Sequence, residues 1–232
     1  MAETLLAALI DGAQKAGADG ADAALATGES LSVSVRLGKT ESVERSEEFA
    51  AGLRVFVGAK VATLAIGQLQ EADIPELAER AVAMAKASPD DPYARLARPN
   101  EVATSLPELD MYDATDLGAE TLLDMAKEAE DTARSYEGIS NSEGGSASQS
   151  HSQFYIAGTH GFQAGYQRSG FGFSTVVLAE NDQEMQRDYD YSSAVYASPL
   201  NPPEDVGRRA AERTLKRLGS RHALTGTCPD IF

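Results

Sequence analysis

Alternation between apolar and polar residues is strongest between Leu31 and Gln70. From Leu31 to Leu37, valine and leucine alternate with serine and arginine, a period of two that is typical of a strand with one buried face. Gly38-Lys39 then breaks the run, and the polar segment from Thr40 to Glu48 could form a return strand.

Two further strands are predicted at Ala50–Val57 and Val61–Ile66, joined by a turn at Gly58, which tolerates a positive φ. These strands form an antiparallel meander with one buried face, and helices are expected to cover that face. The alanine-rich stretch Ala21–Ala26 is either a first strand that leads into the meander or an extension of the first helix.

Apolar residues at spacings of three and four predict four helices. They lie at Thr4–Ala16, Asp73–Ala87, Leu117–Tyr136, and between Pro203 and Gly219. The segment from Tyr93 to Thr115 follows neither period, and we interpret it as a long surface connection rather than a domain boundary.

The segment Ile139–Gly158 is rich in serine and glycine, as a linker would be, yet its side chains are small enough for an exposed strand. A hairpin turn at Thr159-His160-Gly161 and two more strands, Phe162–Glu180 and Met185–Tyr196, are predicted after it. They either continue the first sheet or form a second antiparallel group. The predicted class is α+β (α/β): an antiparallel or mixed meander covered by about four helices, in one domain over residues 1–221.

Composition and net charge limit the classes of function that are compatible with this chain. The chain has 232 residues, 42% of them hydrophobic, which is enough for a sizeable core. Its net charge of −16 disfavours contact with nucleic acid or an anionic membrane. Cys228 is the one cysteine, so an internal disulfide is excluded, and no apolar run approaches the roughly 20 residues of a membrane helix. Without a signal-peptide pattern, the cytoplasm is the expected location.

No strong catalytic motif is present. His151, His160 and His222 lack the spacing of a zinc-binding helix, and Cys228 has no second cysteine nearby. Ser150-His151-Ser152 contains a nucleophile and a base, but neighbouring residues of a strand point to opposite faces. We therefore predict no catalytic, cofactor-binding or metal-binding residue in this chain.

An aspartate pair and a cluster of basic residues each allow a functional and a purely structural interpretation. Asp188 and Asp190 share one face of a predicted strand and could act as an acid–base pair or hold a cation, although we favour a charged solvent face. The last helix carries the one basic cluster of the chain. We interpret it as a solvated face favoured by the helix dipole rather than a phosphate site. The cluster comprises Arg208, Arg209, Arg213, Lys216 and Arg217.

Several segments together resemble the TldD/PmbA family, also called modulators of DNA gyrase. They are Gly52–Gly67, Asn141–Ser150, Thr159–Ser169, Glu184–Ser192 and Gly207–Arg221. The segment Gln186–Ser192 is more similar to the PmbA (TldE) branch than to the TldD branch.

This resemblance implies a two-domain cytoplasmic protein, of which residues 1–221 would be the N-terminal α/β domain. Family chains of the two branches pair into a metallopeptidase complex that acts on unfolded or flexible peptides, including a microcin precursor and an antitoxin. The TldD branch binds its metal through an HExxxH helix, which the PmbA branch lacks. No family metal ligand maps onto this chain, so zinc is expected only in a TldD-like partner.

The first hypothesis is therefore a non-catalytic scaffold that contacts a TldD-like subunit and an unfolded peptide. The second is a stand-alone peptide-binding module, with the serine-rich strand from Ser140 as its open edge. The third is modulation of DNA gyrase by protein contact. Residues 222–232 are expected to be a truncated tail where the second, β-rich domain would begin. A surface left exposed by that truncation is expected to cause self-association.

Overall fold

The structure, a computed structural model, describes residues 2–182, 184–220 and 226. His222 and Cys228, and all of the expected tail apart from Gly226, lie outside this part of the chain. The described residues form four α-helices and two short 3-10 turns. These are α1 (Ala2–Lys15), α2 (Ile74–Ala87), α3 (Gly118–Arg134), α4 (Pro203–Lys216), η1 (Glu71–Asp73) and η2 (Pro99–Glu101).

Six strands form one antiparallel sheet in the order β3-β2-β1-β4-β5-β6. The predicted α+β class is thus confirmed, and the second group of strands continues the first sheet. The strands are β1 (Gly20–Arg36), β2 (Lys39–Val57), β3 (Lys60–Ile66), β4 (Ile139–Gly158), β5 (Gln163–Glu180) and β6 (Met185–Ala194).

The first hairpin is longer than its apolar pattern indicates. Ala21–Ala26 is part of β1 rather than of a helix, and the polar Thr40–Glu48 is part of β2, which confirms the return strand. Leu37 and Gly38 form the turn between them with φ of 51° and 75°. Positive φ at both central residues is the geometry of a type I′ turn, whose twist suits the flanking strands.

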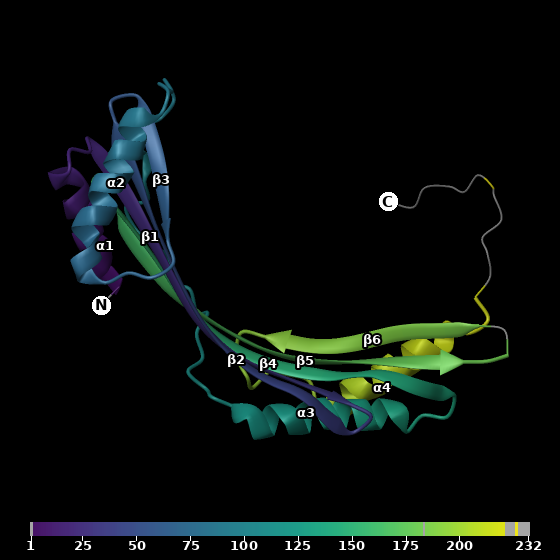
Figure 1. Cartoon of the computed structure of the whole chain (residues 1–232). Helices are drawn as coiled ribbons and strands as arrows, with labels where there is room; N and C mark the ends of the chain where they lie inside the picture. The colour runs from purple at the N-terminus through teal and green to yellow at the C-terminus, as the bar shows by residue number, and fades with distance from the viewer. Residues whose placement is uncertain (1, 183, 221–225, 227–232) are drawn as a thin grey trace.

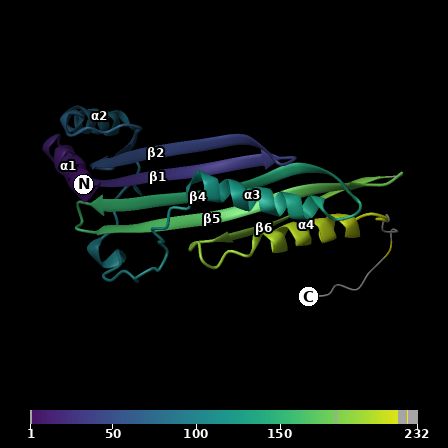
Figure 2. The same ribbon diagram turned by 90° about the horizontal axis from the view of Figure 1, so that it is seen from below.

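The helices cover one face of the sheet. Ala23 and Leu25 of β1 are buried beneath α1 and α2, whereas Val33 and Val35 of the same strand are buried beneath α3 and α4. All four residues are odd-numbered, so they point to the same side of the strand. Figures 1 and 2 show the helix pairs at opposite ends of this face, on the outer side of a bend in the strands. The opposite face carries no helix among the described residues.

Strand β4 lies in the middle of the sheet, between β1 and β5. The expectation that its serine-rich stretch forms an open edge is therefore wrong. Its glycines serve close packing: a Cβ at Gly144 would come 2.3 Å from the carbonyl oxygen of Val35, and a Cβ at Gly145 would come 2.4 Å from that of Ala126. The glycines of this linker-like stretch therefore let strand β1 and helix α3 approach β4 closely.

The connection from Tyr93 to Thr115 runs over the surface, as predicted, with η2 as its one regular element among the described residues. Strand β6 pairs only with Phe171–Glu180 of β5. Beyond Phe171, the last residues of the surface connection lie along β5 in place of β6. There the N–H of Ser169 donates to the carbonyl of Met111 over 3.0 Å, and the hydroxyl of Ser169 accepts the N–H of Asp113.

No helix in the described part of the chain is both long and apolar enough to cross a lipid bilayer.

Candidate functional site

The uncovered face of the sheet is lined by small hydroxyl side chains. Ser30, Ser32 and Ser34 of β1 stand opposite Ser150, Ser148 and Ser146 of β4. Ser32, Ser34, Ser146 and Ser148 alternate with residues that point into the core, such as Val33 and Ala147. Two serine pairs hydrogen-bond through their hydroxyls, Ser34 with Ser42 at 2.9 Å and Ser146 with Ser174 at 3.0 Å. Hydroxyls both donate and accept, so the six serines make this serine face polar without charges of their own, and Glu44 of β2 lies opposite Ser32.

The predicted Ser–His pair is not formed. The hydroxyls of Ser150 and Ser152 face carbonyls of β5, at 3.5 and 3.4 Å, on the uncovered side of the sheet. The ring of His151 lies on the other side, where its Nε2 is 3.1 Å from the carbonyl oxygen of Asp113. Tyr112 and Phe171 contact the ring edge-on. The alternation of a strand thus separates the base from both hydroxyls.

His151 lines a cavity of about 390 Å³ at the beginning of α3, together with Asp116, Gln149 and the ion pair between Glu29 and Arg45. Gln149 is buried and holds this region together: its Oε1 accepts the N–H of Leu117 and its Nε2 donates to Asp116. That bond, with the N–H of Gly118, lowers the pKa of Asp116.

Sequence reasoning missed Gln149. Its signal is a polar residue at an inward position of an alternating strand, two residues after the buried Ala147.

Asp113 is a second anchor beside His151. Its carboxylate accepts the hydroxyl and the N–H of Thr115, and the N–H of Ala197 over 2.9 Å. These bonds, led by the Thr115 hydroxyl, lower the pKa of Asp113. Asp113 therefore ties the surface connection to the segment after β6, and its carboxylate already accepts three hydrogen bonds.

The described residues do not fit a metal site. His160 lies in the turn between β4 and β5, where its Nδ1 accepts the N–H of Phe162, and His151 is held by Asp113. No group of three or more His, Cys, Asp or Glu side chains converges within the described ranges. The prediction that this chain itself supplies no site residue is not tested by this geometry, since His222 and Cys228 lie outside it.

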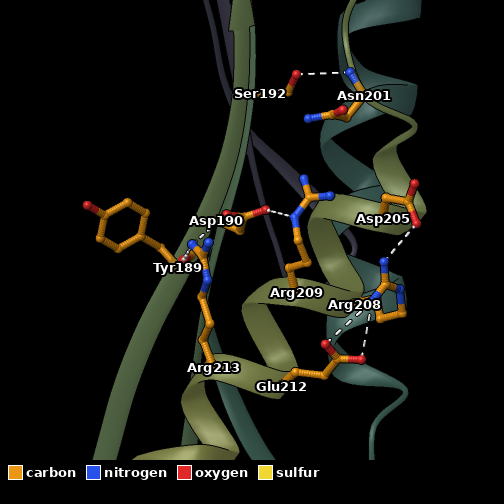
Figure 3. Close-up of polar contacts among 9 residues, drawn as sticks. All are labelled: Tyr189, Asp190, Ser192, Asn201, Asp205, Arg208, Arg209, Glu212 and Arg213. Carbon is orange, nitrogen blue, oxygen red and sulfur yellow. Dashed lines mark hydrogen bonds and ion pairs between the residues drawn. The ribbon is translucent and has the colours of Figure 1, made fainter.

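Asp188 and Asp190 do share one face of β6, but that face is not solvated, so this interpretation was wrong. It packs against α4. The side chain of Asp190 is 5% exposed and accepts hydrogen bonds from Nε of Arg209 at 2.5 Å and Nη1 of Arg213 at 2.6 Å (Figure 3). Nε of Arg217 lies 2.6 Å from Asp188 in the same way.

The pKa of Asp188 reflects competing effects. Its burial raises the pKa, but the N–H of Tyr189 and the guanidinium of Arg217 outweigh burial and leave the pKa lowered. The geometry thus makes both aspartates ion-pair partners of α4 rather than an acid–base pair.

The basic cluster is accordingly only in part a solvated face. Arg209, Arg213 and Arg217 join α4 to the edge strand. Arg208 points away from the sheet and pairs along its own helix with Asp205 and Glu212 (Figure 3).

Comparison with known proteins relates this architecture to a protein family. Residues 21–85 match the family model described as PmbA/TldA metallopeptidase domain 1, and residues 112–218 match the PmbA/TldA metallopeptidase central domain. The two matches lie on either side of the surface connection, while β1 of the first pairs with β4 of the second. One domain over residues 1–221 stays a prediction.

Relatives and solved structures agree with these matches. Metalloprotease PmbA of Escherichia coli O157:H7 is 31% identical over 215 residues, which are 92% of this chain and 48% of that protein. A crystal structure described as a modulator of DNA gyrase from Bacteroides thetaiotaomicron has a TM-score of 0.86 at 21% identity, covering 95% of this chain and 51% of that one. TldE from Thermococcus kodakarensis has a TM-score of 0.69 at 16% identity, covering 89% and 46%.

Fold and matches together correspond to domain 1 and the central domain of the PmbA/TldA family models. The chain belongs to the PmbA/TldD family, as the resemblance of its segments predicted. It spans about half the length of the curated relatives that it matches.

Proposed function

We propose that this chain forms the first half of a PmbA/TldE-like subunit in a cytoplasmic complex with a TldD-like metallopeptidase chain. In this proposal the subunit is not itself catalytic. It provides part of the wall around an unfolded or flexible peptide, and hydrolysis is assigned to zinc held by the partner chain.

The observation that carries this proposal is the serine face. The four described helices lie on the other side of the sheet, so a bent surface without helices remains along β1 and β4. Serines at its centre present hydroxyls that can satisfy peptide groups of either polarity, without bulky side chains that would select one sequence. Such a surface suits transient contact with many extended chains.

The test of the assembly mixes the purified 232-residue chain with a TldD-like chain and measures the mass of the product by light scattering after gel filtration. A stoichiometric complex is expected. Binding of unfolded peptide with no protein partner would instead favour a stand-alone module.

The test of catalysis measures cleavage of unfolded casein with and without 1,10-phenanthroline. The chain alone is expected to show no chelator-sensitive cleavage, and such cleavage by the chain alone would overturn the proposal. In the complex, Ser148→Trp should slow cleavage because the indole occupies the centre of the serine face. Glu120→Gln, an exposed change on the helix side, is the matched control.

A further inference from the structure

A polar hollow of about 500 Å³ lies between β6, the beginning of α4 and the segment that joins them. It is separate from the cavity beside His151. Arg209 and Arg213 form one wall, and Asp190 and Ser192 of the edge strand, which point toward α4, form the other. Asn201 lies at one end, where its N–H donates to the hydroxyl of Ser192 over 2.9 Å (Figure 3).

The charges in this hollow do not balance. Asp190 is the one carboxylate that lines it, and two guanidinium groups bind that single carboxylate. The net charge of the three side chains is therefore +1, in a chain whose total is −16. The Arg209 side chain is only 30% exposed, so its charge is less screened than that of a surface arginine.

Several donors in the hollow are unused. Arg209 binds Asp190 through Nε alone, so its two terminal nitrogens have no partner among the described residues. The Nη2 of Arg213 and the side-chain amide of Asn201 are likewise without a partner in this part of the chain. Figure 3 shows the guanidinium of Arg209 pointing toward Asn201.

We propose that this hollow binds the carboxylate of a peptide. The terminal nitrogens of Arg209 form a planar pair of donors, which matches the two oxygens of a carboxylate. A single negative charge neutralises the excess of +1, whereas a phosphate dianion would leave a negative charge beside Asp190. The site belongs to the chain by itself and does not require a TldD-like partner.

The experiment measures binding of two fluorescent peptides to the full chain by anisotropy. The peptides are identical and otherwise uncharged, one with a free C-terminal carboxylate and one amidated. The free carboxylate should bind at least about tenfold more tightly, the value expected for one charge-assisted bidentate contact. Inorganic phosphate, added as a competitor, should displace the peptide only weakly.

Two variants should change the affinity for the free carboxylate in opposite directions. Arg209→Gln should weaken binding of the free carboxylate about tenfold. Asp190→Asn should strengthen it, because it removes the competing negative charge while keeping the shape. Arg208→Gln is the matched control, since Arg208 lies on the same helix but outside the lining of the hollow.

Asn201→Asp leaves the pairs between β6 and α4 intact and places a negative charge beside Arg209, so it should also weaken binding. If Arg209→Gln fails to fold, this variant still tests whether the hollow binds a carboxylate. Equal affinity for the acid and the amide, tighter binding of phosphate than of the peptide, or equal loss in Arg208→Gln would each overturn the proposal.

Discussion

The buried carboxylate of Glu130 on α3 accepts the backbone N–H of Leu37 over 2.8 Å, and its second oxygen accepts that of Gly38 over 3.0 Å. Glu130 has no solvent-exposed surface. A helix side chain thus closes the turn between β1 and β2, 93 residues away in the chain. This contact fixes the end of the first hairpin against the helix layer.

Glu130→Ala should lower the free energy of unfolding by about 3 kcal/mol, because it leaves two backbone donors of a closed turn without their charged acceptor. Urea denaturation measures the change. Glu120→Ala, at an exposed position of the same helix, should have little effect. A similar loss in both variants would show that the turn does not depend on Glu130.

Gly207 is a point of close approach between α4 and α3. A Cβ there would lie 2.3 Å from the carbonyl oxygen of Ala129 and 2.8 Å from the Cβ of Thr132. Gly207→Ala should therefore lower stability by about 2 kcal/mol, since overpacking outweighs the better helix propensity of alanine. Gly67→Ala, where nothing lies within 4 Å of the added carbon, serves as the control in the same thermal denaturation. A stabilised Gly207 variant would contradict this packing.

The surface connection contains a carboxylate with a strongly lowered pKa. Hydrogen bonds from the Arg95 side chain and the Arg98 N–H lower the pKa of Glu101 from 4.5 to about 2. The ionised Glu101 carboxylate therefore stabilises the folded connection at pH values above its ordinary pKa. This stabilisation is lost as the pH falls toward 2. NMR titration of Glu101 measures the pKa directly. In Arg95→Gln it should rise toward the ordinary value, and an unchanged titration would show that Arg95 is not the cause.

The surface connection also borders an apolar groove of about 540 Å³ on β4 and β5. Leu106, Leu109 and Tyr166 line it and are each about half exposed. Exposed apolar patches favour association, so the isolated chain should self-associate at high concentration in sedimentation experiments. Leu109→Ser should reduce this association.

Val43→Ser, at an equally exposed apolar position far along β2, should leave self-association unchanged. A chain that stays monomeric at high concentration would count against the groove as a contact surface, as would an equal effect of both variants.

Local sequence pattern predicted most of the elements. Alternation around Val33 placed a strand, and the spacing of Val206, Ala210 and Thr214 placed the buried face of α4. These predictions succeed because a strand repeats every two residues and a helix every 3.6. Burial of one face therefore produces a matching spacing of apolar residues in the sequence. Segment similarity likewise identified the family.

The sequence by itself therefore determined the elements, the family and the excess of negative charge. The tertiary structure alone decided that β4 lies at the centre of the sheet and that Asp190 faces Arg209. Backbone N–H and C=O groups are alike in every strand, so local pattern does not specify which strands become neighbours. Since ion pairs form wherever packing brings opposite charges together, the partner of Asp190 was settled only when α4 packed against the edge strand.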